Sequence, residues 1–426
     1  MKILIVGSGG REHALAWKVA QSNQVQTVFV APGNAGTTQE NKVINVAIEA
    51  DDIEALTKFA QENVIDLTII GPELPLVAGI VDKFQLVGLP CFGPTKNASQ
   101  LEGSKLFTKN FLARHHIPTA AYANFTEVEP AIAYIREVGT PIVIKADGLA
   151  AGKGVILAYS EAEAIDAVET MLVNNSFGEA GQNIVIEEFL TGEEASFICM
   201  VDGEHILPLA TSQDHKARDN GDKGPNTGGM GAYSPAPVIT PEIHAQIMTE
   251  IIEPTVRGMA IENNDYTGFL YAGLMIDAQG NAKVLEYNCR LGDPETQPIM
   301  LRLQSDLVEL CMATLDKRLD QVKVEWNPQV SLGVVLAAGG YPEKYEKGFI
   351  INDLSDTVDG KIFHAGTVEK GGKVVTAGGR VLCACSLGDT IQEAQTKAYQ
   401  LVKKISWQDM YYRADIGHRA ISLQTN

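Results

Sequence analysis

The first hundred residues alternate short apolar runs with amphipathic stretches, and this pattern restricts the fold more than any other feature of the chain. The runs Ile3 to Val6, Val28 to Val30 and Leu67 to Ile70 have the length and composition of buried strands. Between the last two runs, Asp51 and Glu54 form a capping-box pattern, and apolar residues follow at helical spacing. Strand–helix–strand order predicts a parallel α/β sheet.

A glycine-rich turn, Gly7-Ser8-Gly9-Gly10-Arg11, follows the first predicted strand and opens a helix. Backbone N–H groups and the helix dipole make such a junction suitable for an anion. A dinucleotide fingerprint would need glycine at position 12, where the chain has Glu12, and an acidic residue after the second strand, which is absent. We therefore expect a smaller phosphate ligand rather than NAD. The alternative is a tight turn that binds nothing.

The rest of the chain also mixes strands and helices. We expect helices at Ser104 to His115, Ser160 to Leu172 and around 241–261. We expect strands at Pro141 to Ile144, Ile184 to Ile186, Leu270 to Ile276 and Lys283 to Cys289. Gly93-Pro94-Thr95 and Trp326-Asn327-Pro328 are candidate boundaries, which suggests about three domains for 426 residues.

Charge and cysteine usage exclude several classes of protein. The chain has 34 Lys and Arg against 53 Asp and Glu, a net charge of −19, which disfavours nucleic acid and anionic membrane as partners. Its six cysteines show no zinc-ligand spacing, so we expect reduced, buried thiols. No apolar run is long enough for a signal peptide core or a membrane helix. These features favour a cytoplasmic protein.

A second glycine-rich loop spans Lys145 to Gly154, after a predicted strand. It is not a P-loop, because Asp147 stands where the first glycine is required and Gly154 where Ser or Thr is required. Small residues still allow backbone amides to approach a polyphosphate, and Lys145 and Lys153 supply positive charge. The alternative is a flexible surface hairpin.

Four carboxylates cluster just beyond this loop, at Glu187, Glu188, Glu193 and Glu194. They could form a solvated edge. Alternatively, an extended segment here could offer backbone groups to a nucleotide base and a carboxylate to ribose hydroxyls. The residues alone do not decide between these two interpretations.

Glu286 and Asn288 lie two residues apart on a predicted strand, so they share a face about 7 Å apart along it. Hard oxygen ligands on one face suit Mg²⁺ or Mn²⁺ that bridges phosphates. The alternative is a polar strand face. However, the dense polar loop 290–297 follows at once, and another lies at 213–231, where a disordered linker would not explain the paired Asp214 and Lys216.

These motifs together resemble the glycinamide ribonucleotide synthetase (phosphoribosylamine–glycine ligase) family of the ATP-grasp superfamily. The matching segments keep their order along the chain and are GSGGREHA at 7–14, APGNAGT at 31–37, GPELPLVAG at 71–79, KADGLAAGKGV at 145–155, QDHK at 213–216, GPNTGGMGAYSP at 224–235 and RLGDPETQ at 290–297. RLGDPETQ and GPNTGGMG are the most specific of them.

The resemblance implies a multidomain α/β and α+β fold. A Rossmann-like parallel α/β domain (1–103) would precede an ATP-grasp core (104–123 and 191–327) that carries a mobile lid (124–190). A small C-terminal α/β domain (328–426) would end the chain. The implied reaction joins 5-phosphoribosylamine to glycine through glycyl phosphate, with ATP as co-substrate and Mg²⁺ or Mn²⁺, in purine synthesis. The partners would be small molecules only.

The resemblance also assigns roles to individual residues. Arg290, Asp214 and Lys145 would be catalytic. ATP would contact Lys105, Lys145, Gly152, Lys153, Gly154, Glu187, Phe189, Leu190 and Glu193. The other substrates would contact Gly9, Gly10, Arg11, Asn34, Pro72, Glu73, Asp214, Gly229 and Arg290. The metal would be held by Glu286 and Asn288.

The chain departs from the family pattern after QDHK, where Ala217 precedes Arg218, and it has no acidic residue aligned near Leu274 to serve as a third metal ligand. Two other functions compete with the ligase. One is an ATP-grasp enzyme that activates a different carboxylate, against which RLGDPETQ argues. The other is a nucleotide-binding sensor or oxidoreductase that uses only the first domain, against which Glu12 argues.

Overall fold

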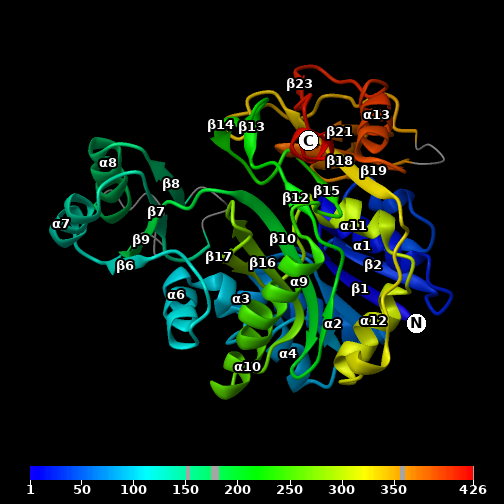
Figure 1. Cartoon of the computed structure of the whole chain (residues 1–426). Helices are drawn as coiled ribbons and strands as arrows, with labels where there is room; N and C mark the ends of the chain where they lie inside the picture. The colour runs from blue at the N-terminus through cyan, green and yellow to red at the C-terminus, as the bar shows by residue number, and fades with distance from the viewer. Residues whose placement is uncertain (150–153, 174–181, 356–359, 426) are drawn as a thin grey trace.

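The structure is a computed structural model that describes residues 1–149, 154–173, 182–355 and 360–425. Figure 1 shows an N-terminal α/β unit beside a central antiparallel sheet, a small unit that projects to one side, and a C-terminal unit above them. Among the helices of the described residues, none is long and apolar enough to cross a bilayer. All six cysteines are buried and free, as expected.

The N-terminal unit contains a five-stranded sheet in the order β3-β2-β1-β4-β5, and every pairing in it is parallel. Its strands are β1 (Lys2–Gly7), β2 (Thr27–Pro32), β3 (Val43–Asn45), β4 (Leu67–Ile70) and β5 (Cys91–Phe92). Its helical segments are α1 (Gly10–Ala20), η1 (Thr37–Gln39), α2 (Ile53–Asn63), α3 (Glu73–Ala78) and α4 (Ile80–Leu86). The predicted parallel α/β sheet is therefore confirmed.

The capping box predicted before α2 is wrong by one residue. Asp52 is the N-cap, and its side chain accepts a hydrogen bond from the Ala55 N–H group at 3.0 Å. Because Ala55 occupies the third helical position, Glu54 cannot complete a reciprocal capping box. Glu54 instead stands in the first turn, where its negative charge interacts favourably with the positive end of the helix dipole.

The projecting unit is a four-stranded antiparallel sheet in the order β6-β9-β7-β8, and two helices pack against it. Its elements are β6 (Tyr122–Phe125), α7 (Val128–Val138), β7 (Ile142–Ala146), β8 (Val155–Ala158), α8 (Glu161–Leu172) and β9 (Ile184–Glu188). Ser160 and Glu163 form the predicted capping box of α8. Ile144, Val168 and Ile186 belong to an apolar core confined to this unit.

The central sheet is antiparallel, in the order β11-β10-β16-β17. Its strands are β10 (Glu193–Asp202), β11 (Ile206–Pro208), β16 (Thr267–Ile276) and β17 (Ala282–Asn288). The surrounding helical segments are α5 (Gln100–Gly103), α6 (Lys105–Arg114), α9 (Pro241–Ile247), η3 (Met248–Ile252), α10 (Glu253–Ile261), α11 (Thr296–Arg302), α12 (Leu307–Leu315) and η4 (Leu319–Gln321). The helix expected around 241–261 is present, with η3 as a π-helical turn inside it.

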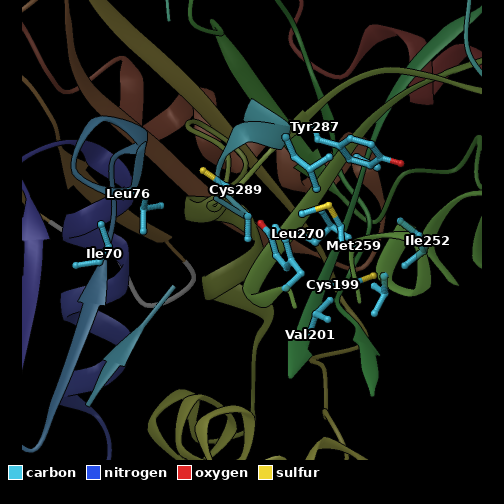
Figure 2. Packing of buried hydrophobic residues seen from close by; sticks show 14 of the residues in the cluster. Ile70, Leu76, Cys199, Val201, Ile252, Met259, Leu270, Tyr287 and Cys289 are labelled. Atoms are coloured by element: carbon cyan, nitrogen blue, oxygen red, sulfur yellow. The ribbon is translucent and has the colours of Figure 1, made fainter. Parts of the chain in front are cut away.

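A shared apolar core joins the N-terminal unit to the central sheet. Figure 2 shows Ile70 and Leu76 of the N-terminal unit in the same cluster as Val201 on β10, Leu270 on β16 and Met259 on α10. Interiors are close-packed, so such a core fixes the two units relative to one another. The loops that leave the two units are therefore held in fixed positions relative to one another.

The C-terminal sheet is antiparallel, in the order β12-β15-β18-β22-β19. Its strands are β12 (Gln213–Asp214), β15 (Gly231–Ser234), β18 (Val330–Ala338), β19 (Gly360–His364) and β22 (Arg380–Gly388), and β23 (Met410–Tyr411) pairs with β18. The remaining elements are the hairpins β13 (Ala217–Asp219) with β14 (Lys223–Asn226) and β20 (Thr367–Lys370) with β21 (Lys373–Thr376), and the helices α13 (Ile391–Val402) and α14 (His418–Thr425). β12 and β15 thus enter this sheet from the middle of the chain.

Candidate active site

A cleft of about 630 Å³ lies where the projecting unit, the central sheet and loops of the N- and C-terminal units meet. Its lining includes most of the residues singled out from the sequence, which are Arg11, Glu73, Lys105, Lys145, Gly154, Glu187, Phe189, Leu190, Asp214, Glu286, Asn288 and Arg290. Folding brings these residues together from positions as far apart as 11 and 290.

Three lysines gather at the end of the cleft beside the projecting unit, and two of them pair with one carboxylate. Lys109 Nζ lies 2.8 Å from Glu187 Oε2, and Lys145 Nζ lies 2.9 Å from Glu187 Oε1. Lys105 Nζ donates to the Gly148 carbonyl at 3.0 Å. Among the described residues, Glu187 is the only carboxylate ion-paired with these lysines, so this end of the cleft keeps positive charge for a polyanion.

Lys109 is a site residue that the sequence analysis missed. It lies four residues after Lys105 on α6, and this spacing puts both side chains on one helix face. That spacing was the available signal. Burial lowers the pKa of both lysines, and the pKa of Lys109 falls to about 8 although the neighbouring Glu187 favours its charged form.

Phe189 and Leu190 follow β9 directly and form part of an apolar wall of the cleft. The ring of Phe189 lies 5.7 Å from the ring of Tyr159 in an edge-on arrangement. Val143, Leu157 and Met275 also line the cleft. An apolar wall beside a cationic end suits a ligand with a flat base and a phosphate chain.

A β-bulge turns Glu286 toward the cleft. The register of β17 against β16 shifts between Val284 and Glu286, so Leu285 is an extra residue. In a regular strand without the bulge, the two-residue period would put the Glu286 side chain on the same face as Val284, which is completely buried. Because the bulge precedes both residues, Glu286 and Asn288 line the cleft together.

The chemistry of these two side chains fits a hard divalent cation. Burial disfavours the charge on Glu286, but Lys216, Lys145 and Lys105 together lower its pKa, so the carboxylate is ionised at neutral pH. The Asn288 side chain makes no hydrogen bond among the described residues. Within the same part of the chain, no group of three or more His, Cys, Asp or Glu side chains forms a complete metal site.

Asp214 and Lys216 sit in a dense set of charges at the centre of the cleft. Lys216 Nζ lies 2.9 Å from Glu194 Oε2 and 3.8 Å from Glu286 Oε1. Burial opposes the charge on Lys216, but these carboxylates raise its pKa well above the usual value. Burial and the carboxylate of Glu295 raise the pKa of Asp214 to about 8. Asp214 can therefore exchange a proton close to neutral pH.

Arg290 is held between two carboxylates. Its Nη2 lies 2.7 Å from Glu102 Oε1, and its Nε lies 3.2 Å from Glu73 Oε2. Burial raises the pKa of Glu102, whereas Arg290 and Arg11 lower the pKa of Glu73 to about 2 against the effect of burial. Glu102, which also accepts from the Cys289 N–H at 2.7 Å, carries no sequence motif that would have revealed it.

The first glycine turn is filled by its own glutamate. The Glu12 carboxylate accepts from the Gly9 N–H at 2.5 Å and pairs with Arg11 Nε at 2.6 Å. A Cβ atom on Gly71 would lie 2.0 Å from Glu12 Oε1, which explains glycine there. The Gly9 N–H group is therefore bound by this carboxylate, a Cβ atom on Gly10 would lie 2.4 Å from Gln297 Nε2, and only Arg11 of the turn lines the cleft.

Other predicted residues lie away from the lining. They are Gly9, Gly10, Asn34, Pro72, Glu193 and Gly229, while Gly152 and Lys153 are outside the described residues. The Asn34 amide donates to the carbonyls of Ser8 at 2.8 Å and His364 at 2.9 Å, which joins the N- and C-terminal units. Glu193 Oε2 accepts from Arg419 at 3.1 Å instead of facing the cleft. Substrate contact by these residues stays a prediction.

Two residues of the 213–218 segment are structural. His215 is buried, and burial lowers its pKa to about 3, so its ring is neutral. Its Nε2 accepts from the Gly417 N–H at 3.2 Å, and its Nδ1 lies 3.3 Å from the Gly231 carbonyl. Arg218 pairs with Asp219 at 2.8 Å and does not line the cleft.

Two antiparallel sheets that face one another across a cleft of lysines and carboxylates define an ATP-grasp enzyme. The chain belongs to the phosphoribosylglycinamide synthetase family. The N domain of this family matches residues 1–102, its ATP-grasp (A) domain matches 103–296 and its C domain matches 331–419.

Relatives support this membership over the whole length of the chain. A phosphoribosylamine–glycine ligase from Vibrio vulnificus strain YJ016 is 66% identical over 424 residues, which is 99% of each chain. One from Salmonella typhimurium strain LT2 is 65% identical over 429 residues, which is all of both chains. The crystal structure of the Thermotoga maritima ligase is 36% identical, with a TM-score of 0.85 over 98% of this chain and 100% of that one.

More distant structures share only the fold. The biotin carboxylase domain of the Hydrogenobacter thermophilus 2-oxoglutarate carboxylase has a TM-score of 0.75 at 14% identity, over 96% of this chain and 91% of that one.

The family match and the similar ligases together show that the chain is an ATP-dependent, ADP-forming ligase of de novo purine synthesis. The expected fold class, enzyme class and use of ATP with Mg²⁺ or Mn²⁺ are confirmed, and the oxidoreductase alternative is excluded.

Proposed function

We propose that this chain joins 5-phosphoribosylamine to glycine in the cleft described above. A glycine carboxylate oxygen attacks the γ-phosphorus of ATP, so that ADP leaves and glycyl phosphate forms. The amine of phosphoribosylamine then attacks the glycyl carbonyl carbon, loses a proton and displaces phosphate. The observation that carries the proposal is a single cleft with lysines at one end, arginines at the other and ionised Glu286 between them.

The lysine end is proposed to bind the phosphates of ATP. Phosphoryl transfer depends mainly on positioning and on charge stabilisation, which ammonium groups supply. Lys105 and Lys145 line the cleft, and Glu187 holds Lys145 in place. The wall that includes Phe189 and Leu190 would receive the adenine. We propose the same function for Gly152, Lys153 and Gly154 over the phosphates, and a contact between Glu193 and the ribose.

A divalent ion fits beside the phosphates. Glu286 and Asn288 would hold Mg²⁺ or Mn²⁺ through an ionised carboxylate and an amide oxygen. When bound, the ion would neutralise charge on the β- and γ-phosphates. Lys216 Nζ lies 3.8 Å from Glu286 Oε1 and favours the ionised form of this carboxylate. The other carboxylate oxygen of Glu286 stays available to the ion.

The opposite end is proposed to bind glycine and phosphoribosylamine. Arg290 would face the acyl phosphate or the glycine carboxylate, with its direction set by Glu73 and Glu102. Asp214, in its ionised form, would accept the proton that the attacking amine releases, and its pKa of about 8 predicts that this form becomes more abundant as the pH rises toward 8. Gly229 is assigned to the neighbourhood of glycine, and Gly9, Gly10, Arg11, Asn34, Pro72 and Glu73 to that of phosphoribosylamine.

The domain boundaries named from the sequence are proposed as functional units. Residues 124–190 would close as a lid over ATP, because β6, β7, β8 and β9 share no strand with the other sheets and project from the body of the molecule (Figure 1). We infer a cytoplasmic location from the six free thiols, because oxidising compartments favour disulfides.

Isotope transfer tests the proposed reaction. Glycine labelled with ¹⁸O in its carboxylate is incubated with ATP, phosphoribosylamine and Mg²⁺, and the phosphate released is analysed by mass spectrometry. We expect ADP release to require both glycine and phosphoribosylamine, and one ¹⁸O atom to appear in each phosphate. ADP release without glycine, or unlabelled phosphate, would contradict the proposal.

A further inference from the structure

The C-terminal unit contributes two side chains to the cleft, although no sequence motif marks them. Tyr341 lies in the turn after β18, and Arg380 is the first residue of β22. Both line the cleft. They reach it beside the glycine-rich segment 224–231, of which Asn226, Thr227 and Gly228 also form part of the lining.

Both side chains hold the same glycine. The Gly228 N–H donates to Tyr341 Oη at 3.1 Å, and Arg380 Nη1 donates to the Gly228 carbonyl at 2.5 Å. The donor and the acceptor of one residue's backbone are thus both bonded to the C-terminal unit. A backbone held at its N–H and C=O groups has little freedom to rotate about its own dihedrals.

Arg380 also ties this glycine to the loop that carries Arg290. Its Nη1 donates to the Asp293 carbonyl at 2.5 Å, and its Nη2 lies 3.3 Å from Asp293 Oδ2. Arg380 and Arg11 lower the pKa of Asp293 against the effect of burial, so this ion pair persists at neutral pH. One guanidinium fork therefore joins the 224–231 segment to the 290–297 loop.

The packing leaves no room for larger residues at these contacts. A Cβ atom on Gly228 would lie 2.9 Å from Arg380 Cζ, and one on Gly229 would lie 2.4 Å from Pro294 Cδ. On the other side, a Cβ atom on Gly379 would lie 2.4 Å from the Tyr341 ring. The glycines therefore allow close approach between segments that are far apart in sequence.

We propose that Tyr341 and Arg380 are positioning residues for the subsite that binds the amino-acid substrate. They fix Gly228, and with it Gly229, against the loop that carries Arg290. The inference rests on the proposed function, because it takes glycine as the ligand at this end of the cleft. It gives residues 328–426 a part in catalysis without direct contact with the reacting atoms.

Steady-state kinetics of Tyr341→Phe test the proposal. This change removes only the acceptor for the Gly228 N–H, and loss of one such hydrogen bond should raise the KM for glycine about 3- to 10-fold. Arg380→Ala removes a charged fork and should raise it about 10- to 100-fold, with partial recovery in Arg380→Lys. The KM for ATP should change less than about twofold in every variant, because the lysine end is untouched.

Lys373→Ala, at an exposed position on β21, is the matched control and should leave all constants unchanged. Melting temperatures of the variants show whether a raised KM reflects lost positioning or partial unfolding. If Arg380→Ala does not fold, Tyr341→Phe alone still tests the proposal. A folded Tyr341→Phe enzyme with an unchanged KM for glycine, or with an equal rise for ATP, would overturn the proposal. Glycine-independent ADP release by the unmodified enzyme would instead contradict the proposed function.

Discussion

The two ends of the cleft solve opposite electrostatic problems. At the lysine end, Lys109 and Lys145 share the carboxylate of Glu187, while Lys105 donates to the Gly148 carbonyl and has no ion-pair partner among the described residues. At the arginine end, each guanidinium is already bound by acids, as Arg290 is by Glu73 and Glu102. A lysine is a point charge that a mobile polyphosphate can satisfy, whereas an arginine fork fixed by partners favours one geometry. The comparison suggests that one end supplies charge and the other supplies orientation.

The carboxylate between the two ends is the most severe test of this division. Glu286→Ala should reduce turnover by about 10³-fold or more, because it removes the ionised ligand proposed for the metal that neutralises the phosphates. ADP release measured with saturating substrates checks this. Glu204→Ala, which removes an exposed turn carboxylate, is the control. Near-normal turnover in Glu286→Ala would contradict the metal assignment.

The lysine end is tested by Lys145→Ala. We expect kcat/KM for ATP to fall about 10²- to 10³-fold, since charge neutralisation dominates phosphoryl transfer. The same assay on Lys58→Ala, an exposed lysine of α2, should show no change. If Lys145→Ala left kcat/KM for ATP unchanged, the leftover charge at this end would have no function in binding phosphate.

The arginine end is tested by Arg11→Ala. We expect the KM for phosphoribosylamine to rise about tenfold, the usual cost of a charged hydrogen bond, while the KM for ATP changes little. Arg11 lines the cleft at the start of α1 and is held by Glu12, away from the lysines. An effect confined to ATP would assign the first glycine turn to the other end of the cleft.

The smallest effect is expected for Lys109→Arg. With a pKa of about 8, Lys109 carries its charge below that pH and loses it above, so kcat/KM for ATP should fall on the alkaline side near pH 8. Arginine stays protonated there, so the fall should move to higher pH, with less than about a threefold change at pH 7. Lys58→Arg should leave the pH profile unaltered. A profile of Lys109→Arg that overlays the original would contradict the role of Lys109.

Local chemistry explains what the sequence could predict. Strand periodicity located β1, β2 and β4, and the Ser160 with Glu163 pattern located the start of α8. The lining of the cleft follows motifs in which glycines and charged residues are adjacent. Asp51 was confused with Asp52 because both can cap a helix and only backbone geometry selects one.

Features that depend on distant pairing could not be predicted. The bulge at Leu285 exists only in the register of β17 against β16, so the strand pattern alone gave no sign of it. Glu102 and Arg380 owe their place in the cleft to partners far along the chain. Glu193 and Glu194 are adjacent in sequence, but successive side chains of β10 point to opposite faces of the sheet. Glu193 therefore pairs with Arg419, and Glu194 pairs with Lys216.

The entry of β12 and β15 into the C-terminal sheet has a consequence for modularity. A chain cut near residue 328 would leave β15 without its partner β18, and an unpaired strand edge is a template for aggregation. Conversely, the last hundred residues alone would lack two strands of their sheet. Any exchange of the C-terminal unit between related enzymes would therefore have to carry residues 213–234 with it. The inherited unit is discontinuous, and its two parts meet at the cleft.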